Sequence, residues 1–68
     1  MIVKSFKRKQ NVSVHLTTGR TFEGVLMSER GDYLELRNAG VEVEGKMIPA
    51  DGVVLLPKER VEFVQVTK

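Results

Sequence analysis

The side chains that could carry out acid–base or nucleophilic chemistry are few in this sequence. Its single histidine, His15, lies two residues after Ser13, so in an extended strand the two side chains would share one face. No cysteine is present, and no carboxylate stands at a spacing that would complete a catalytic triad with this pair. We interpret His15 as a solvent-facing strand histidine and predict that the protein is not an enzyme.

The nine acidic side chains are scattered along the chain. Glu42 and Glu44 would share one face of a segment, and Glu23 and Glu35 would lie at outward positions of neighbouring strands. Two-carboxylate hydrolysis and cation binding need acids that converge, which these spacings do not indicate. The phosphate-binding pattern G-x-x-x-x-G-K-[ST] is also absent. We therefore expect no metal, no cofactor and no small-molecule substrate.

A small set of polar residues could instead bind a single-stranded nucleic acid. Aromatic stacking combined with cationic contacts is the usual mode that tolerates different sequences. Tyrosine is also a favoured strand residue, so cross-strand packing is the alternative role for the only tyrosine. The candidates are Tyr33, Arg37, Lys58 and Arg60.

Basic side chains gather at the N-terminus. Four of the eleven Lys and Arg residues lie within the first ten positions, where there is no acid. The rest of the chain holds the other seven basic residues and all nine acids. Duplex DNA binding needs cations spread over one face, so this distribution disfavours a general DNA binder. The cluster, Lys4, Lys7, Arg8 and Lys9, predicts either a local contact or a solvated run that aids solubility.

A chain of 68 residues is long enough for one domain only. Small folds usually add disulfides, a metal or self-association to a marginal core, and the lack of cysteine favours self-association. No apolar run approaches the roughly 20 residues of a membrane span, and the N-terminus lacks the apolar stretch of a secretory signal. We predict a soluble cytoplasmic protein with no membrane partner.

Apolar and polar residues alternate over residues 12–39, which is the period of a half-buried strand. The pattern predicts three strands at about residues 12–17, 21–28 and 32–39, with turns at Gly19 and Gly31. Gly24 falls in the middle of the second strand, where a glycine usually marks a bend or a close backbone approach. This indicates a strand that bends to serve two sides of a small barrel.

Residues 40–51 are predicted to be a variable loop with two short alternating pieces, in which Val41 and Val43 would extend the third strand and pair with Met47 and Ile48.

Residues 53–56 and 60–66 predict two further strands, whose apolar residues do not alternate. Such runs indicate cover on both faces, and an identical neighbouring copy is the economical source of that cover. The fold class is therefore all-β, with five short strands in a small barrel whose closure removes most edges. The first ten residues predict a short helix or an extended arm. The candidate interface residues are Val53, Val54, Leu55, Leu56, Val61, Phe63, Val64 and Val66.

The order of these residues resembles the Sm and Sm-like family in two motifs. The first motif, within residues 12–39, is Val12-x-Val14-x-Leu16-x-x-Gly19-Arg20-x-Phe22-x-Gly24-x-Leu26, followed by Leu34-x-Leu36-x-Asn38-Ala39. The second, degraded, lies within residues 52–66 and is Gly52-Val53-Val54-Leu55-Leu56-Pro57-Lys58-Glu59-Arg60-Val61-x-Phe63-Val64. The resemblance implies an N-terminal helix on a strongly bent five-stranded SH3-like barrel. It also implies homo-oligomeric rings of six or seven subunits, in which the fourth strand of one subunit pairs with the fifth strand of the next. Such rings would bind uridine- or adenine-rich single-stranded RNA.

The RNA pocket implied by the resemblance carries over poorly. The family places an aromatic residue or histidine two residues before an asparagine in the turn into the third strand, where this chain reads Gly31-Asp32-Tyr33. The family's Arg-Gly pair is Pro57-Lys58 here. The stacking group, the asparagine and the arginine are thus replaced, and Lys58 with Tyr33 could form a different pocket.

Two other functions are alternatives to RNA binding for this sequence. A non-enzymatic structural or adaptor ring, for instance a component of a phage particle, would keep the fold and discard the RNA pocket, which the replaced residues favour. An SH3-like module for proline-rich peptides is disfavoured because the sequence lacks the aromatic residues of such a groove.

Overall fold

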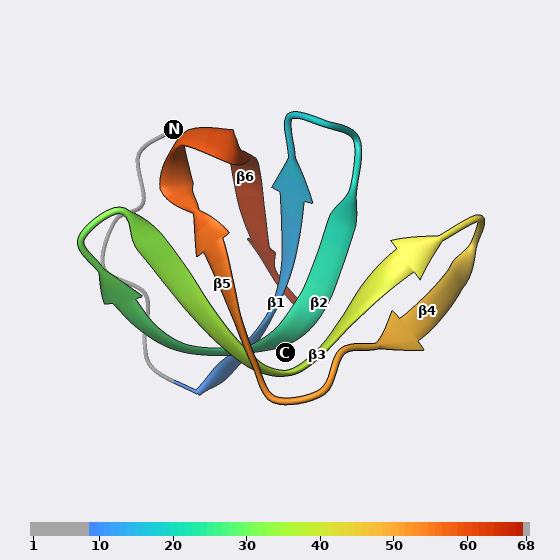
Figure 1. Cartoon of the computed structure of the whole chain (residues 1–68), viewed down its shortest axis with the longest axis horizontal. Coiled ribbons are helices and arrows are strands. Elements are labelled where there is room, and N and C mark those ends of the chain that lie inside the picture. Colours follow the sequence, from blue (N-terminus) through green and yellow to red (C-terminus); the bar gives the residue numbers. More distant parts are fainter. Residues whose placement is uncertain (1–8, 68) are drawn as a thin grey trace.

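The computed structural model describes residues 9–67, which form one antiparallel β-sheet that folds over on itself (Figure 1). The helix or arm predicted for residues 1–10 therefore lies almost entirely outside the described residues. In order, the elements are β1 (Gln10–Leu16), β2 (Thr21–Arg30), β3 (Tyr33–Val43), β4 (Lys46–Pro49), β5 (Val53–Pro57), the 3-10 turn η1 (Lys58–Arg60) and β6 (Val61–Val66).

The long strand β3 connects the two sides of the fold. Its first half pairs with β5, from Tyr33 opposite Pro57 to Arg37 opposite Val53, whereas its second half pairs with β4. The strand order is β4-β3-β2-β1-β6, with β5 attached to β3 away from this path. The prediction of a strongly bent, all-β architecture is confirmed.

The predicted number of five strands is wrong, because the sheet has six. Residues 50–52 interrupt the strand that returns along β3, with Gly52 in the left-handed region at φ 79°. The backbone N–H of Ala50 still donates to the carbonyl of Ala39 at 2.8 Å, so the interruption divides one arm into β4 and β5 without detaching it from β3.

Much of the predicted variable loop over residues 40–51 is a β-hairpin that projects from the rest of the sheet (Figure 1). Val41 pairs with Ile48 and Val43 with Lys46, so the predicted extension of the third strand is confirmed. The hairpin turns at Glu44 and Gly45, which have φ of 52° and 80°. Two successive positive φ values suit the right-handed twist of the flanking strands.

Gly24 lies at a close approach of β2 to β3, as its position in the sequence predicts. A Cβ atom at this glycine would lie 3.0 Å from both the Cα of Ala39 and the carbonyl oxygen of Arg37. The β2–β3 register shifts between Glu23 and Val25, so the ladder is irregular at this bend. Only a residue without a side chain lets the two backbones meet in this way.

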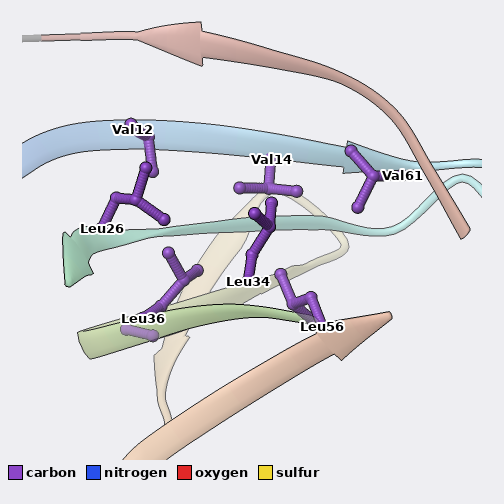
Figure 2. Close-up of a cluster of buried hydrophobic side chains, with 8 residues drawn as sticks. Val12, Val14, Leu26, Leu34, Leu36, Leu56 and Val61 are labelled. Atoms are coloured by element: carbon purple, nitrogen blue, oxygen red, sulfur yellow. The ribbon is translucent and has the colours of Figure 1, made fainter. Parts of the chain in front are cut away.

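The core is a single cluster of aliphatic side chains that alternate along the strands and point toward one another (Figure 2). The alternation predicted for the first three strands is confirmed, because Val12, Val14, Leu34 and Leu36 are at most 1% exposed. Leu56 and Val61 complete the cluster from β5 and the start of β6, together with Leu26 and Ala39. Over residues 9–67 the structure contains no helix long and apolar enough to cross a membrane.

Candidate nucleic-acid interface

Two of the four predicted nucleic-acid contacts, Tyr33 and Lys58, lie at one hollow of about 240 Å³. The hollow lies between the turn that precedes β3 and the turn that follows β5. The pairing of Tyr33 with Pro57 and a 2.7 Å hydrogen bond from the Lys58 backbone N–H to the Asp32 carbonyl hold these turns together. The lining residues are Asp32, Tyr33, Pro57, Lys58 and Glu59.

The Lys58 ammonium forms an ion pair with the carboxylate of Glu29, which lies near the end of β2. Its Nζ lies 3.4 Å from Oε2 of Glu29, and the two side chains are 29% and 27% exposed. Partial exposure screens such a pair, so its contribution to stability is small. The pair nevertheless holds the cation beside the hollow, where a bound anion would compete with Glu29 for it.

The other two predicted contacts do not line the hollow. Arg37 is on the same face of β3 as Tyr33 but four residues further, which is about 13 Å along a strand. Its Nε is 4.0 Å from Oε2 of Glu35, and its side chain is 57% exposed. Arg60 ends η1, where its carbonyl accepts a 2.8 Å hydrogen bond from the Thr17 N–H near the β1–β2 turn.

Sequence reasoning missed the two carboxylates of the hollow, those of Asp32 and Glu59. Both stand next to a predicted contact in the sequence, and both fall in the turns that the resemblance places at the RNA pocket. Their neighbours Arg30 and Arg60 add cations, so residues 29–33 and 57–60 together hold three acids and three bases. The hollow therefore has carboxylates in its lining and no excess of either charge around it.

His15 belongs to a packed polar cluster on the opposite face of β1 from the core. Its ring stacks on that of Phe63, with centroids 4.2 Å apart and an interplanar angle of 17°. Nε2 lies 3.3 Å from Oγ of Ser13, and Nδ1 lies 3.3 Å from Oγ1 of Thr21. The predicted solvent-facing histidine is therefore partly covered, and its neighbour Ser13 is 5% exposed. Both ring nitrogens have hydroxyl partners, which gives the histidine a structural role.

No other described feature gathers the predicted site residues. A larger, more open hollow of about 390 Å³ lies beside the β3–β4 hairpin, against Gly24, Ala39 and Met47, and none of the four predicted contacts lines it. Among residues 9–67 there is no group of three or more His, Asp or Glu side chains that could hold a metal ion. That the protein is not an enzyme stays a prediction.

The strands β5 and β6 each have one edge without a partner among the described residues. β5 pairs only with β3, and β6 pairs only with β1. Of the eight candidate interface residues, four are large and exposed: Val53, Leu55, Phe63 and Val66. Val54 and Val64 pack against the core, and Leu56 and Val61 lie within it, so these four side chains face inward.

Solved structures share this architecture. A heptameric archaeal Sm protein matches with a TM-score of 0.80 and 23% identity over 88% of each chain. A Pyrococcus abyssii Sm protein in complex with a uridine heptamer matches with a TM-score of 0.79 and 21% identity, over 88% of this chain and 86% of that one. A chain in the NatC complex bound to CoA matches with a TM-score of 0.78 and 20% identity, over 97% and 91%.

These likenesses concern the fold, since one architecture can serve unrelated activities. No protein-family model matches the sequence, and no curated protein matches it significantly. The TM-scores of 0.80 and 0.79 over most of both chains confirm the fold that the resemblance implies. This chain has the Sm fold.

Proposed function

We propose that the protein forms a homo-oligomeric Sm-like ring of six or seven subunits and binds single-stranded RNA at the hollow that contains Tyr33 and Lys58. One observation carries the proposal: within residues 9–67, β5 and β6 each have an edge that pairs with no other strand, and both strands carry exposed apolar side chains.

The free edges support assembly because unpaired backbone N–H and C=O groups form a template for another strand. Pairing β5 of one copy with β6 of the next would complete both edges. The same contact would remove from water the side chains of Leu55, 54% exposed, and Phe63, 48% exposed. Fully burying one such side chain contributes about 1.5–3 kcal/mol.

The hollow supports RNA binding because it combines an aromatic ring, a cation and a size that suits one base. Tyr33 is 46% exposed, so its ring is accessible for stacking. Lys58 can reach a phosphate or a base oxygen once it leaves Glu29, which lies 3.4 Å away. A ring would repeat this hollow in every subunit, so successive nucleotides of one strand could occupy successive copies. The P. abyssii Sm protein that shares the fold was solved with a uridine heptamer.

Two measurements on the purified full-length protein test the proposal. Native mass spectrometry should give a single species of six or seven chains. Fluorescence anisotropy with labelled heptauridine and heptaadenosine at two salt concentrations should show binding that weakens as salt increases. A stable monomer at high concentration would contradict the ring, and no binding of either oligonucleotide at low salt would contradict RNA binding.

A structural or adaptor ring without RNA binding is the second candidate. The observation that favours it is the Lys58–Glu29 ion pair, which occupies the cation that an RNA contact would need. A ring of the expected mass that binds neither oligonucleotide would support this candidate.

A further inference from the structure

We infer that the hollow between the β2–β3 and β5–β6 turns selects guanine, through the carboxylates of Asp32 and Glu59 and the ammonium of Lys58. The inference rests on the proposed RNA binding and concerns which base the site accepts. It follows from the chemistry of the lining residues, which differs from the aromatic, asparagine and arginine set that the family resemblance implies.

The volume of the hollow sets the size of the ligand. At about 240 Å³ it is smaller than the roughly 300–1,000 Å³ of sites for drug-sized molecules, so it fits a single base-sized group. The uncharged residues of its lining are Tyr33 and Pro57, which are paired across β3 and β5. A planar base can stack on the tyrosine ring.

The two carboxylates decide which base edge suits the hollow. An ionised carboxylate is an acceptor only, and its two oxygens can take two parallel hydrogen bonds. Guanine presents two adjacent donors, N1–H and the N2 amine, on its Watson–Crick edge. Uracil has one donor, N3–H, between two carbonyl oxygens, so a carboxylate facing that edge would be repelled by a carbonyl. Adenine pairs its N6 donor with an acceptor at N1.

Lys58 adds a hydrogen-bond donor that suits guanine. Its backbone N–H is bound to the Asp32 carbonyl at 2.7 Å, so the lysine and the aspartate approach the hollow from adjacent positions. Beside its two donors guanine carries the O6 acceptor, which an ammonium can contact. The order acceptor, donor, donor along guanine therefore complements the Lys58 ammonium and one carboxylate, which either Asp32 or Glu59 can supply.

The surrounding charges are compatible with a nucleotide. Residues 29–33 and 57–60 contain Glu29, Asp32 and Glu59 against Arg30, Lys58 and Arg60, so the carboxylates do not give the turns a net negative charge. Arg30 and Arg60 are exposed and do not line the hollow, which leaves them available to the phosphates on either side of a bound base.

The test uses fluorescence anisotropy with the full-length protein in its native assembly. The probes are labelled heptauridine and the same heptamer with its central uridine replaced by guanosine, inosine or 7-deazaguanosine. A good bidentate contact discriminates between bases by about 1–3 kcal/mol, so the guanosine heptamer should bind about tenfold more tightly than heptauridine. Inosine lacks the N2 amine and should lose most of this gain, whereas 7-deazaguanosine keeps the Watson–Crick edge and should retain it.

The matched variants keep side-chain shape and change only charge. The double variant Asp32→Asn/Glu59→Gln should abolish the guanosine preference. Glu42→Gln/Glu44→Gln makes the same charge change on the distant hairpin and should preserve it. Circular dichroism and native mass spectrometry would confirm that both variants fold and assemble.

The outcomes separate this inference from the proposed function. If heptauridine binds and guanosine gives no gain, or if the gain survives in Asp32→Asn/Glu59→Gln, the guanine inference is overturned while RNA binding stands. If none of the four oligonucleotides binds at low salt, RNA binding fails as well. In that case the carboxylates and Tyr33 would suit a cationic peptide as the ligand.

Discussion

The Nζ atom of Lys58 lies 3.4 Å from Oε2 of Glu29, across the boundary between the β5–β6 turn and the end of β2. This ion pair sets the orientation of the one cation that lines the hollow. A nucleic acid must therefore displace the Glu29 carboxylate to reach the Lys58 ammonium.

Replacement of Glu29 by glutamine should strengthen RNA binding. The variant removes the competing charge while preserving shape, and partly exposed ion pairs are worth about 0.2–1 kcal/mol, so we expect up to a fivefold lower Kd for heptauridine. Lys58→Gln should weaken binding and reduce the slope of log K against log salt by about one. Anisotropy titrations at three salt concentrations measure both effects. An unchanged salt slope in Lys58→Gln would remove this residue from the phosphate contacts.

Replacement of Leu55 by aspartate should dissociate the oligomer into folded monomers. The Leu55 side chain is 54% exposed on β5, so the charge does not enter the subunit core but would face the free edge of a neighbour. Sedimentation velocity measures the mass, and circular dichroism measures the retained β-structure. Thr18→Asp, which places the same charge in the exposed β1–β2 turn, is the control and should keep the native mass. A Leu55→Asp protein of native mass would contradict an interface at β5.

Replacement of Gly24 by alanine should destabilise the subunit. The added methyl group would meet two backbone atoms at 3.0 Å, the Cα of Ala39 and the carbonyl oxygen of Arg37, and neither can move without shifting β3. Overpacking of this kind costs about 1–3 kcal/mol, which urea denaturation would show as a lower midpoint. Thr18→Ala, in an exposed turn, should change stability by less than about 0.5 kcal/mol. Equal midpoints for Gly24→Ala and the wild type would show that the close approach can relax.

Replacement of Glu44 by asparagine should stabilise the projecting hairpin. Glu44 has a φ of 52° at the turn, and left-handed backbone costs an ordinary residue about 1–2 kcal/mol, which asparagine partly avoids. We expect a gain of about 0.5 kcal/mol and slower amide exchange in β4. Glu42→Asn, two residues earlier in β3, should give no such gain because it is outside the turn. Faster exchange in Glu44→Asn would contradict the turn geometry.

The sequence was sufficient to predict the core face of the first three strands, because strict alternation assigns Val12, Val14 and Leu36 to one side whatever the tertiary path. Gly24 was predictable for a similar reason, since a mid-strand glycine has few structural uses. Leu56 and Val61 were assigned to an interface because their strands are apolar without alternation, a pattern that does not reveal which side chains face inward. The break between β4 and β5 at residues 50–52 was missed because it depends on how the chain after the hairpin pairs with β3.

For the site, Tyr33 and Lys58 line one hollow, and both lie in turns that the resemblance places at the RNA pocket; their role in binding stays a prediction. That Asp32 and Glu59 line one hollow was not predictable from spacing, since 27 positions separate them in the sequence. A tertiary hydrogen bond from the Lys58 N–H to the Asp32 carbonyl brings their turns together. Arg37 does not line the hollow, and its place on the same face as Tyr33 does not reveal their separation along the strand.

The two edges that lack a partner within residues 9–67 belong to different strands, β5 and β6, so contact through them would be head-to-tail and not the self-complementary contact of a twofold dimer. Each added copy leaves the same two edges free, and growth stops only when the rotation between copies divides a full circle. In the proposed ring, the curvature of the sheet would set that rotation. Changes that flatten the bend at Gly24 would therefore convert a closed assembly into an open helical filament, a polymer that electron microscopy would reveal directly.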